Sequence, residues 1–241
     1  MNLPRVKILK LGTLLAEPGS DDRYVTLRAL LGVGGGSTVT LIECVDDRLI
    51  LVDTGFDREW DLSEENVKRN ARCLRTALEG EGLRPNDVDI VFLTHHHLDH
   101  AGNLHMFTSA LWLGSRPLEG RIRGLMGVRD GEEICPGVKV IYTPGHVASH
   151  ASLLVDAVLR GRLWGVNTLT RAKVAVAGDA VISESWFRSG KVYSLNRDFY
   201  SAEEARRSAS LLARLAEVVI PGHGIPFTTE GSAFDRRAGP G

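Results

Sequence analysis

The stretch THHHLDH occupies residues 94–100 and places four of the chain's eight histidines beside one aspartate. It directly follows residues 87–94 (DVDIVFLT), an almost continuous apolar run that predicts a buried strand. The histidines therefore stand at the C-terminal end of a strand, where open α/β sheets usually place ligand-binding loops. A polar loop with exposed histidines is the alternative, and the density of histidine in so short a stretch argues against it.

The spacing within this stretch suits a metal site. In an extended loop the side chains of His95 and His97 point the same way, because the strand period is two. A turn into a helix at Asp99 would direct Asp99 and His100 toward a neighbouring point. Imidazole nitrogen and carboxylate oxygen suit Zn²⁺ first, with iron or manganese as alternatives.

Three further segments repeat one design, a single candidate ligand directly after an apolar strand and beside glycine. They are TPGH (143–146), AGD (177–179) and PGHG (221–224), which contribute His146, Asp179 and His223. Glycine lets the backbone bend sharply and approach an ion closely. Taken alone, the two histidines could be turn residues and the aspartate a helix cap; together with THHHLDH they supply the missing ligands.

Strand-like runs and helical segments alternate along the chain, which predicts an α/β fold with two sheets sandwiched between helices. The expected strands are 5–13, 37–45, 48–55, 87–94, 110–115, 137–146, 150–157, 173–180 and 217–224, and the expected helices are 63–80 and about 201–217. The 43% hydrophobic content can bury one sizeable core, and no linker divides the chain. We therefore expect one domain over residues 1–241.

Composition narrows the partners and the compartment. The 29 basic and 30 acidic residues nearly cancel, so no broad basic surface for nucleic acid is visible, although a local patch stays open. No apolar stretch approaches the ~18 residues that would span a bilayer, and the N-terminus lacks signal-peptide features. Three cysteines without a CxxC pair predict no structural disulfide and a cytoplasmic location.

Taken in order, LVDTG (51–55), THHHLDH, TPGH, AGD and PGHG resemble the five motifs of the metallo-β-lactamase superfamily, across nearly the whole chain. The resemblance implies an αββα sandwich of two mixed β-sheets flanked by helices, with metals at one edge of the sheets. It implies a first metal held by His95, His97 and His146, a second held by Asp99, His100 and His223, Asp179 bridging both, and Asp53 supporting the ligand loop from behind. HLDHAGNLHMF and VAGDAVISESW are also similar to small metallo-β-lactamase-domain proteins that consist of one compact domain.

Two divalent ions would lower the pKa of bound water toward ~7 and so provide a hydroxide nucleophile at neutral pH. Asp99 is the expected catalytic residue, orienting that hydroxide and moving its proton. The predicted reaction is hydrolysis of an ester, lactone, thioester or phosphodiester bond in a small molecule. A non-catalytic binding module would be expected to lack part of the ligand set, and this set is complete.

The resemblance leaves the branch of the superfamily open. Acyl-homoserine lactonases have a tyrosine three residues after the bridging aspartate, where this chain has Ile182, and Tyr193 is a possible substitute. Persulfide dioxygenases, which use one iron, have a GRTD segment where this chain has ESWFRSG (184–190). Relatives often dimerise, so a homodimer is also possible.

Several aromatic and histidine side chains have less defined predicted roles. We expect His96 to be structural, His105 to lie at the surface or behind the ligands, and His150 to resemble a lactonase position. Pocket or core positions are expected for Trp60, Trp186, Phe187, Tyr193 and Tyr200.

Overall fold

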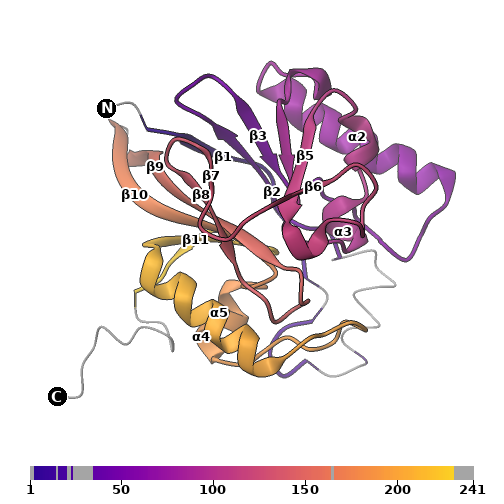
Figure 1. Cartoon of the computed structure of the whole chain (residues 1–241), viewed down its shortest axis with the longest axis vertical. Coiled ribbons are helices and arrows are strands. Elements are labelled where there is room, and N and C mark those ends of the chain that lie inside the picture. The colour runs from indigo at the N-terminus through magenta and orange to yellow at the C-terminus, as the bar shows by residue number, and fades with distance from the viewer. Residues whose placement is uncertain (1–2, 15, 21–22, 24–34, 164–165, 231–241) are drawn as a thin grey trace.

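The computed structural model describes residues 3–14, 16–20, 23, 35–163 and 166–230, and they form a sandwich of two mixed sheets (Figure 1). The first sheet contains β1 (Arg5–Lys10), β2 (Val39–Glu43), β3 (Leu49–Val52), β4 (Ile90–Phe92), β5 (Leu111–Ser115) and β6 (Met126–Val128). The second contains β7 (Glu133–Cys135), β8 (Val138–Tyr142), β9 (Ala151–Leu163), β10 (Val166–Gly178), β11 (Val218–Pro221) and β12 (Phe227–Thr228). The two are joined at one place, where Arg5 of β1 pairs with Val158 of β9.

Helices cover the outer faces of both sheets. They are α2 (Glu64–Gly80), α3 (Leu98–Ala101), α4 (Glu184–Ser189) and α5 (Ala202–Leu215), with short 3₁₀ turns at Pro85–Asp87, Leu104–Met106 and Arg116–Leu118. Figure 1 shows α2 and α5 on opposite sides of the strands. Serines begin the long helices, since the Ser63 side chain accepts from the Asn66 amide and the Ser201 side chain from the Glu204 amide.

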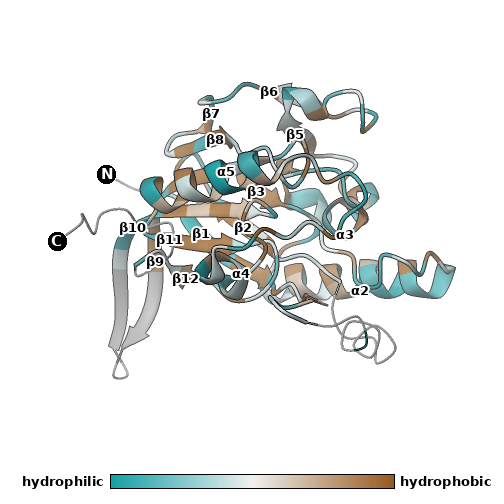
Figure 2. Cartoon of the chain, turned by 90° about the horizontal axis from the view of Figure 1, so that it is seen from below, coloured by the Kyte–Doolittle hydropathy of each residue, from teal (hydrophilic) through white to brown (hydrophobic). Residues whose placement is uncertain are grey.

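Three apolar clusters fill the three interfaces between the four layers. Successive side chains of β4 point to opposite faces of the sheet, so they join different clusters. Phe92 faces the cluster between the sheets, and Val91 faces the cluster under α2. In β10, Val174 faces the cluster between the sheets and Ala175 faces the cluster under α5. Figure 2 shows hydrophobic strands between more polar helix surfaces. The predicted αββα sandwich is confirmed.

The predicted elements exist, but their lengths differ. The strands expected at 150–157 and 173–180 are β9 and β10, which extend into a long hairpin whose outer residues have no apolar run to mark them. Helix α4 was not predicted, although Ser183 gives a capping signal by accepting from the Trp186 amide. The single domain over 1–241 stays a prediction, because residues at both ends lie outside the described ranges.

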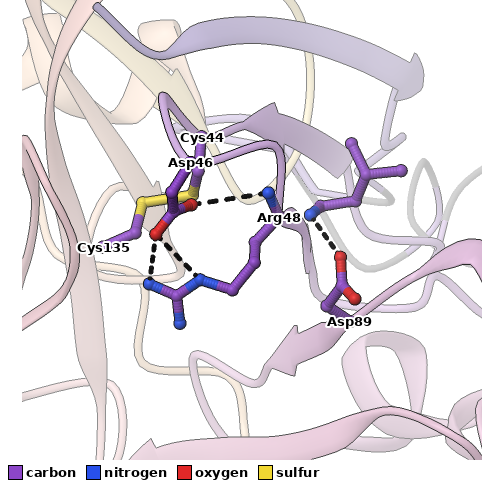
Figure 3. The surroundings of a disulfide bond; sticks show 6 residues. Cys44, Asp46, Arg48, Asp89 and Cys135 are labelled. Carbon is purple, nitrogen blue, oxygen red and sulfur yellow. Dashed lines mark hydrogen bonds and ion pairs between the residues drawn. A yellow bond between two sulfur atoms is a disulfide. The ribbon is translucent and has the colours of Figure 1, made fainter.

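The prediction of no structural disulfide is wrong, because Cys44 and Cys135 are bonded, with Cα atoms 6.4 Å apart (Figure 3). Cys44 follows β2 at the turn into β3, and Cys135 ends β7. Both lie buried in the core between the sheets. The two are 91 residues apart in sequence, so no short cysteine motif could reveal the pair, which packing of one sheet on the other brings together. Cys73 on α2 is free and exposed.

None of the helices in the described ranges is both long enough and apolar enough to cross a membrane.

Candidate metal centre

The strand ends converge at one edge of the sandwich and carry the predicted ligands there. Asp53 follows β3, His146 follows β8, and Asp179 follows β10. The run from His95 begins after β4 and turns into α3 at Leu98, one residue before the turn at Asp99 considered from the sequence. Strand ends are rigid, so these side chains are held in place before any ligand arrives.

The seven predicted ligands form two groups. His95, His97, His146 and Asp179 make one, and Asp99, His100 and His223 make the other, with the ligand atoms of each group within 4.8 Å of one another. Six of the seven side chains are buried, and that of His97 is 20% exposed. Residues from 95 to 223 therefore meet at one place, as the motifs predicted.

In the first group, the surrounding hydrogen bonds determine which nitrogens carry protons. The Thr94 hydroxyl donates to the Asp53 carboxylate at 2.9 Å, so it accepts from His95 Nδ1 at 3.1 Å. His97 Nε2 donates to Asp198 Oδ1 at 2.7 Å. Each neutral imidazole has one proton, so His95 Nε2 and His97 Nδ1 are both bare.

The second group is fixed in the same way. His100 Nδ1 donates to Asp53 Oδ2 at 2.7 Å. His223 Nδ1 donates to the carbonyl oxygens of Thr13 and Gly36 at 2.9 and 3.0 Å. The Nε2 atoms of both histidines face the Asp179 carboxylate, at 3.1 Å from His100 and 3.4 Å from His223.

These donors fit divalent cations. His95 Nε2 and His97 Nδ1 lie 2.9 Å apart, and two bare nitrogens repel each other unless a positive charge lies between them. His146 Nε2 lies 3.0 Å from the same His97 nitrogen. A set of three imidazoles and a carboxylate is what Zn²⁺ takes in proteins, at ~2.0–2.2 Å from each ligand atom.

Asp179 lies between the two groups. Its Oδ1 faces His100 and His223, and its Oδ2 is 3.2 Å from His146 Nε2. The neighbouring motif glycine makes room for this carboxylate, since a Cβ on Gly222 would overlap Asp179 Oδ1. That glycine therefore makes room for the Asp179 carboxylate, where the sequence suggested an approach to the ion itself.

The site separates the pKa values of its histidines. Burial lowers the pKa of His95 well below its usual value and that of His146 to about 4. Burial also opposes the charging of His100, but the carboxylates of Asp99, Asp179 and Asp53 together raise its pKa well above the usual value. Burial would raise the pKa of Asp179, yet the surrounding histidines hold it well below the usual value.

Asp99 occupies a position between pocket and ligands. Its Oδ2 lies 3.4 Å from the Nε2 atoms of both His100 and His223. Its side chain is 10% exposed and lines the adjoining cavity. The carboxylate can therefore reach both a bound ion and a substrate.

A cavity of about 450 Å³ opens over the ligands and is lined by both groups. Leu14, Ile182 and Leu195 give it apolar walls, and Glu59 and Arg197 give it charged ones. Burial raises the pKa of Glu59, with the charge of Asp99 adding to the effect.

The aromatic predictions divide. Tyr193 lines the cavity and stacks on His146, with ring centroids 6.3 Å apart, and burial raises its pKa to about 12. Trp186 packs edge-on against Tyr193. Phe187 belongs to the core under α5. Trp60 and Tyr200 are exposed, and neither is among the described residues that line this cavity.

The three remaining histidines differ in environment. His105 lies at the surface, near the carbonyl of Gly102. His150 is buried, and its Nδ1 lies 2.8 Å from Thr143 Oγ1. His96 is half-buried and lies 2.9 Å from the carboxylate of Asp198.

Sequence reasoning missed Asp198, Thr94 as a hydrogen-bond partner, and the carbonyl of Thr13. Asp198 lies 101 residues from His97, in no motif. Every residue has a backbone carbonyl, so the sequence cannot show which carbonyl will accept a hydrogen bond from a histidine. Only Thr94 had a signal, since it directly precedes His95 at the strand end.

Comparisons with known proteins agree with this geometry. A family model described as Metallo-beta-lactamase superfamily matches residues 32–123. The chain is 32% identical over 206 residues to Metallo-beta-lactamase domain-containing protein 1 of Rattus norvegicus, covering 84% of this chain and 72% of that protein. It is 39% identical over 172 residues to Hydroxyacylglutathione hydrolase of Brucella anthropi, covering 61% of this chain and 65% of that protein.

The fold has solved counterparts. A crystal structure described as Quorum-Quenching N-Acyl Homoserine Lactone Lactonase aligns with a TM-score of 0.62 at 19% identity, covering 93% of this chain and 94% of that one. The chain spans 61% and 65% of the length of the curated relatives from Xenopus laevis and Homo sapiens that share the rat protein's name. The described fold, the ligand groups and these matches together show that the chain belongs to the metallo-β-lactamase superfamily.

Proposed function

We propose that this chain hydrolyses an ester, lactone, thioester or phosphodiester bond with two divalent metal ions, zinc being the ion that its donors suit best. The observation that supports this most strongly is the pair of bare nitrogens, His95 Nε2 and His97 Nδ1, 2.9 Å apart. Neither of these two histidines offers a proton to the other, since their opposite nitrogens both donate elsewhere.

One ion would be held by His95, His97 and His146, and the other by Asp99, His100 and His223, with Asp179 between them. When bound, such ions lower the pKa of water toward ~7 and polarise the oxygen under attack. Asp99 then holds and moves the proton, because its carboxylate lies in the cavity wall beside the second group. The chain needs no serine or cysteine nucleophile for this reaction.

The cavity supports a small-molecule substrate. Its volume of about 450 Å³ lies in the ~300–1,000 Å³ range of small-molecule sites. The relatives named as a hydroxyacylglutathione hydrolase and a lactone lactonase favour a carbonyl substrate, a thioester or a lactone, over a phosphodiester. Nucleic acid as a partner, which the composition left open, and a homodimer, which the resemblance made possible, are both untested.

A screen of the metal-loaded protein against lactones, thioesters, simple esters and phosphodiesters tests the proposal. We expect turnover of at least one class, abolished by chelation and restored by Zn²⁺. Replacing Asp99 with alanine should lower kcat about 10²–10⁴-fold, since that is the usual contribution of a positioned acid–base group. Full activity of Asp99→Ala, or one tightly bound iron with oxygen consumption and no hydrolysis, would overturn it.

The cytoplasmic location also stays a prediction. It was based partly on the expected absence of a disulfide, and that support is lost. Disulfides form and persist mainly in oxidising compartments, and Cys44 and Cys135 are bonded in this structure. Thiol titration of protein taken directly from its native cells, under acid quench, tests the location. Three reactive thiols per denatured chain would support the cytoplasm, and one would contradict it.

A further inference from the structure

We propose that Asp198 is a positioning residue that holds His97 in the tautomer whose bare Nδ1 faces His95 and His146. It thereby connects the pocket segment 191–200 to the first ligand group. This inference rests on the proposed function, because it concerns the same metal site. Nothing in the sequence motifs or in the named relatives assigns a role to this residue.

The contacts of Asp198 carry the inference. Its Oδ1 lies 2.7 Å from His97 Nε2, and its Oδ2 lies 2.9 Å from His96 Nε2. One carboxylate therefore engages two histidines of the ligand run, from a segment 101 residues away. His95, in the same run, is held by Thr94 instead.

Asn196 fixes the carboxylate in turn. Its Nδ2 donates to Asp198 Oδ1 at 3.2 Å and to the carbonyl oxygen of His146 at 3.1 Å. The amides of Tyr200 and Ser201 both donate to the carbonyl of Gly145, at 3.1 Å. The segment that carries Asp198 is thus tied to the loops that carry His97 and His146.

An ionised carboxylate only accepts hydrogen bonds, so His97 must present its proton at Nε2 and leave Nδ1 bare. Oδ1 of Asp198 accepts from both His97 Nε2 and Asn196 Nδ2. Without this acceptor, the proton could move to Nδ1 and donate to His95 Nε2, 2.9 Å away. A metal would then have to displace a proton from the centre of its own site.

A purely structural ion pair explains these contacts poorly. The Asp198 side chain is 42% exposed, and exposed pairs contribute ~0–1 kcal/mol to stability. Asp198 also lines the cavity beside His97, so the segment that forms the pocket wall sets the tautomer of a ligand. Carboxylates behind metal-bound histidines commonly change metal affinity about 10–100-fold when removed.

The test compares Asp198→Ala, Asp198→Asn and a matched control, Asp87→Ala, whose exposed carboxylate pairs with Arg84 far from the ligands. Long-range ¹H–¹⁵N spectra of the metal-free proteins report the tautomer of His97. Chelator competition with Zn²⁺ gives the affinity of each bound ion. We expect the Nε2–H form in the wild type, in Asp198→Asn and in the control, because asparagine keeps one acceptor oxygen.

In Asp198→Ala we expect the Nδ1–H form to appear and the affinity for one ion to fall about 10–100-fold, with the other unchanged. An unaltered tautomer and affinity in Asp198→Ala would overturn the inference. So would the Nδ1–H form of His97 in Asp198→Asn, and this outcome can be read even if the alanine variant does not fold. A wild type that binds no divalent ion would overturn the proposed function instead, while the metal-free spectra would still decide the role of Asp198.

Discussion

The two ends of strands β3 and β8 differ. At one end, called the site end, β3 leads into Asp53 and β8 into the His146 loop. At the other, called the far end, Cys44 lies in the turn before β3 and Cys135 in the hairpin before β8. The site end buries polar atoms without hydrogen-bond partners, among them His146 Nδ1 and His150 Nε2. The far end buries a disulfide in apolar surroundings and keeps its charged groups at the surface.

This difference shows how one fold separates function from stability. Buried polar atoms without partners cost about 1–3 kcal/mol each, so the site end lowers the stability of the metal-free protein. The cross-link and the core around it offset that cost at a place where no chemistry is needed. Proteins commonly violate local packing rules at functional sites and compensate elsewhere.

The largest effect should come from removing the cross-link. A disulfide that closes a loop of 91 residues stabilises by about 4–5 kcal/mol in the chain-entropy model. The Cys44→Ala/Cys135→Ala variant should therefore unfold at much lower denaturant concentration, with unchanged metal content and kcat. Equilibrium urea unfolding and metal analysis measure both. Loss of bound metal in the folded variant would break the proposed separation of the two ends.

A smaller effect is expected from Asp53→Asn at the site end. Asp53 accepts from the Thr94 amide, the Thr94 hydroxyl and His100 Nδ1, and an amide oxygen cannot satisfy all three. We expect ~1–3 kcal/mol of destabilisation and about 10–100-fold weaker binding of one ion.

The matched control is Asp46→Asn at the far end, where the exposed carboxylate pairs with Arg48 (Figure 3). It should change stability by less than ~1 kcal/mol and leave metal affinity alone. Equal effects of the two substitutions would remove the distinction between the ends.

The smallest effect concerns pH. Burial lowers the pKa of His150 well below 6.5, so below about pH 6.5 the unfolded chain takes up a proton that the folded chain refuses. Stability contributed by this group is intact above that pH and is lost as the pH falls, by at most ~1.4 kcal/mol per pH unit. Metal-free His150→Gln should show a shallower decline between pH 6.5 and 5 in urea unfolding. An identical slope would show that His150 protonates freely in the folded protein.

The sequence predicted the ligands because their chemistry is visible in residue type and position. His95, His146 and His223 each follow an apolar strand, and strand ends meet at one edge of a sandwich. The layers were predictable for the same reason, since apolar alternation in β4 and β10 shows which faces are covered.

What the sequence could not show depends on contacts between distant segments. Asp198 reaches His97 only because the segment before α5 folds over the ligand run. Cys44 meets Cys135 only because the two sheets pack face to face, so counting cysteines gave the wrong answer. The strands β9 and β10 continue to Leu163 and from Val166, beyond the apolar runs that predicted them, so the sequence pattern did not give their lengths.

The most direct test is the metal content of the purified protein and of His100→Ala, measured by native mass spectrometry after equilibration with Zn²⁺. His100 belongs to the second ligand group alone. The account predicts two ions per wild-type chain and one in the variant, retained by His95, His97 and His146. One ion in both proteins, or none in the wild type, would contradict it.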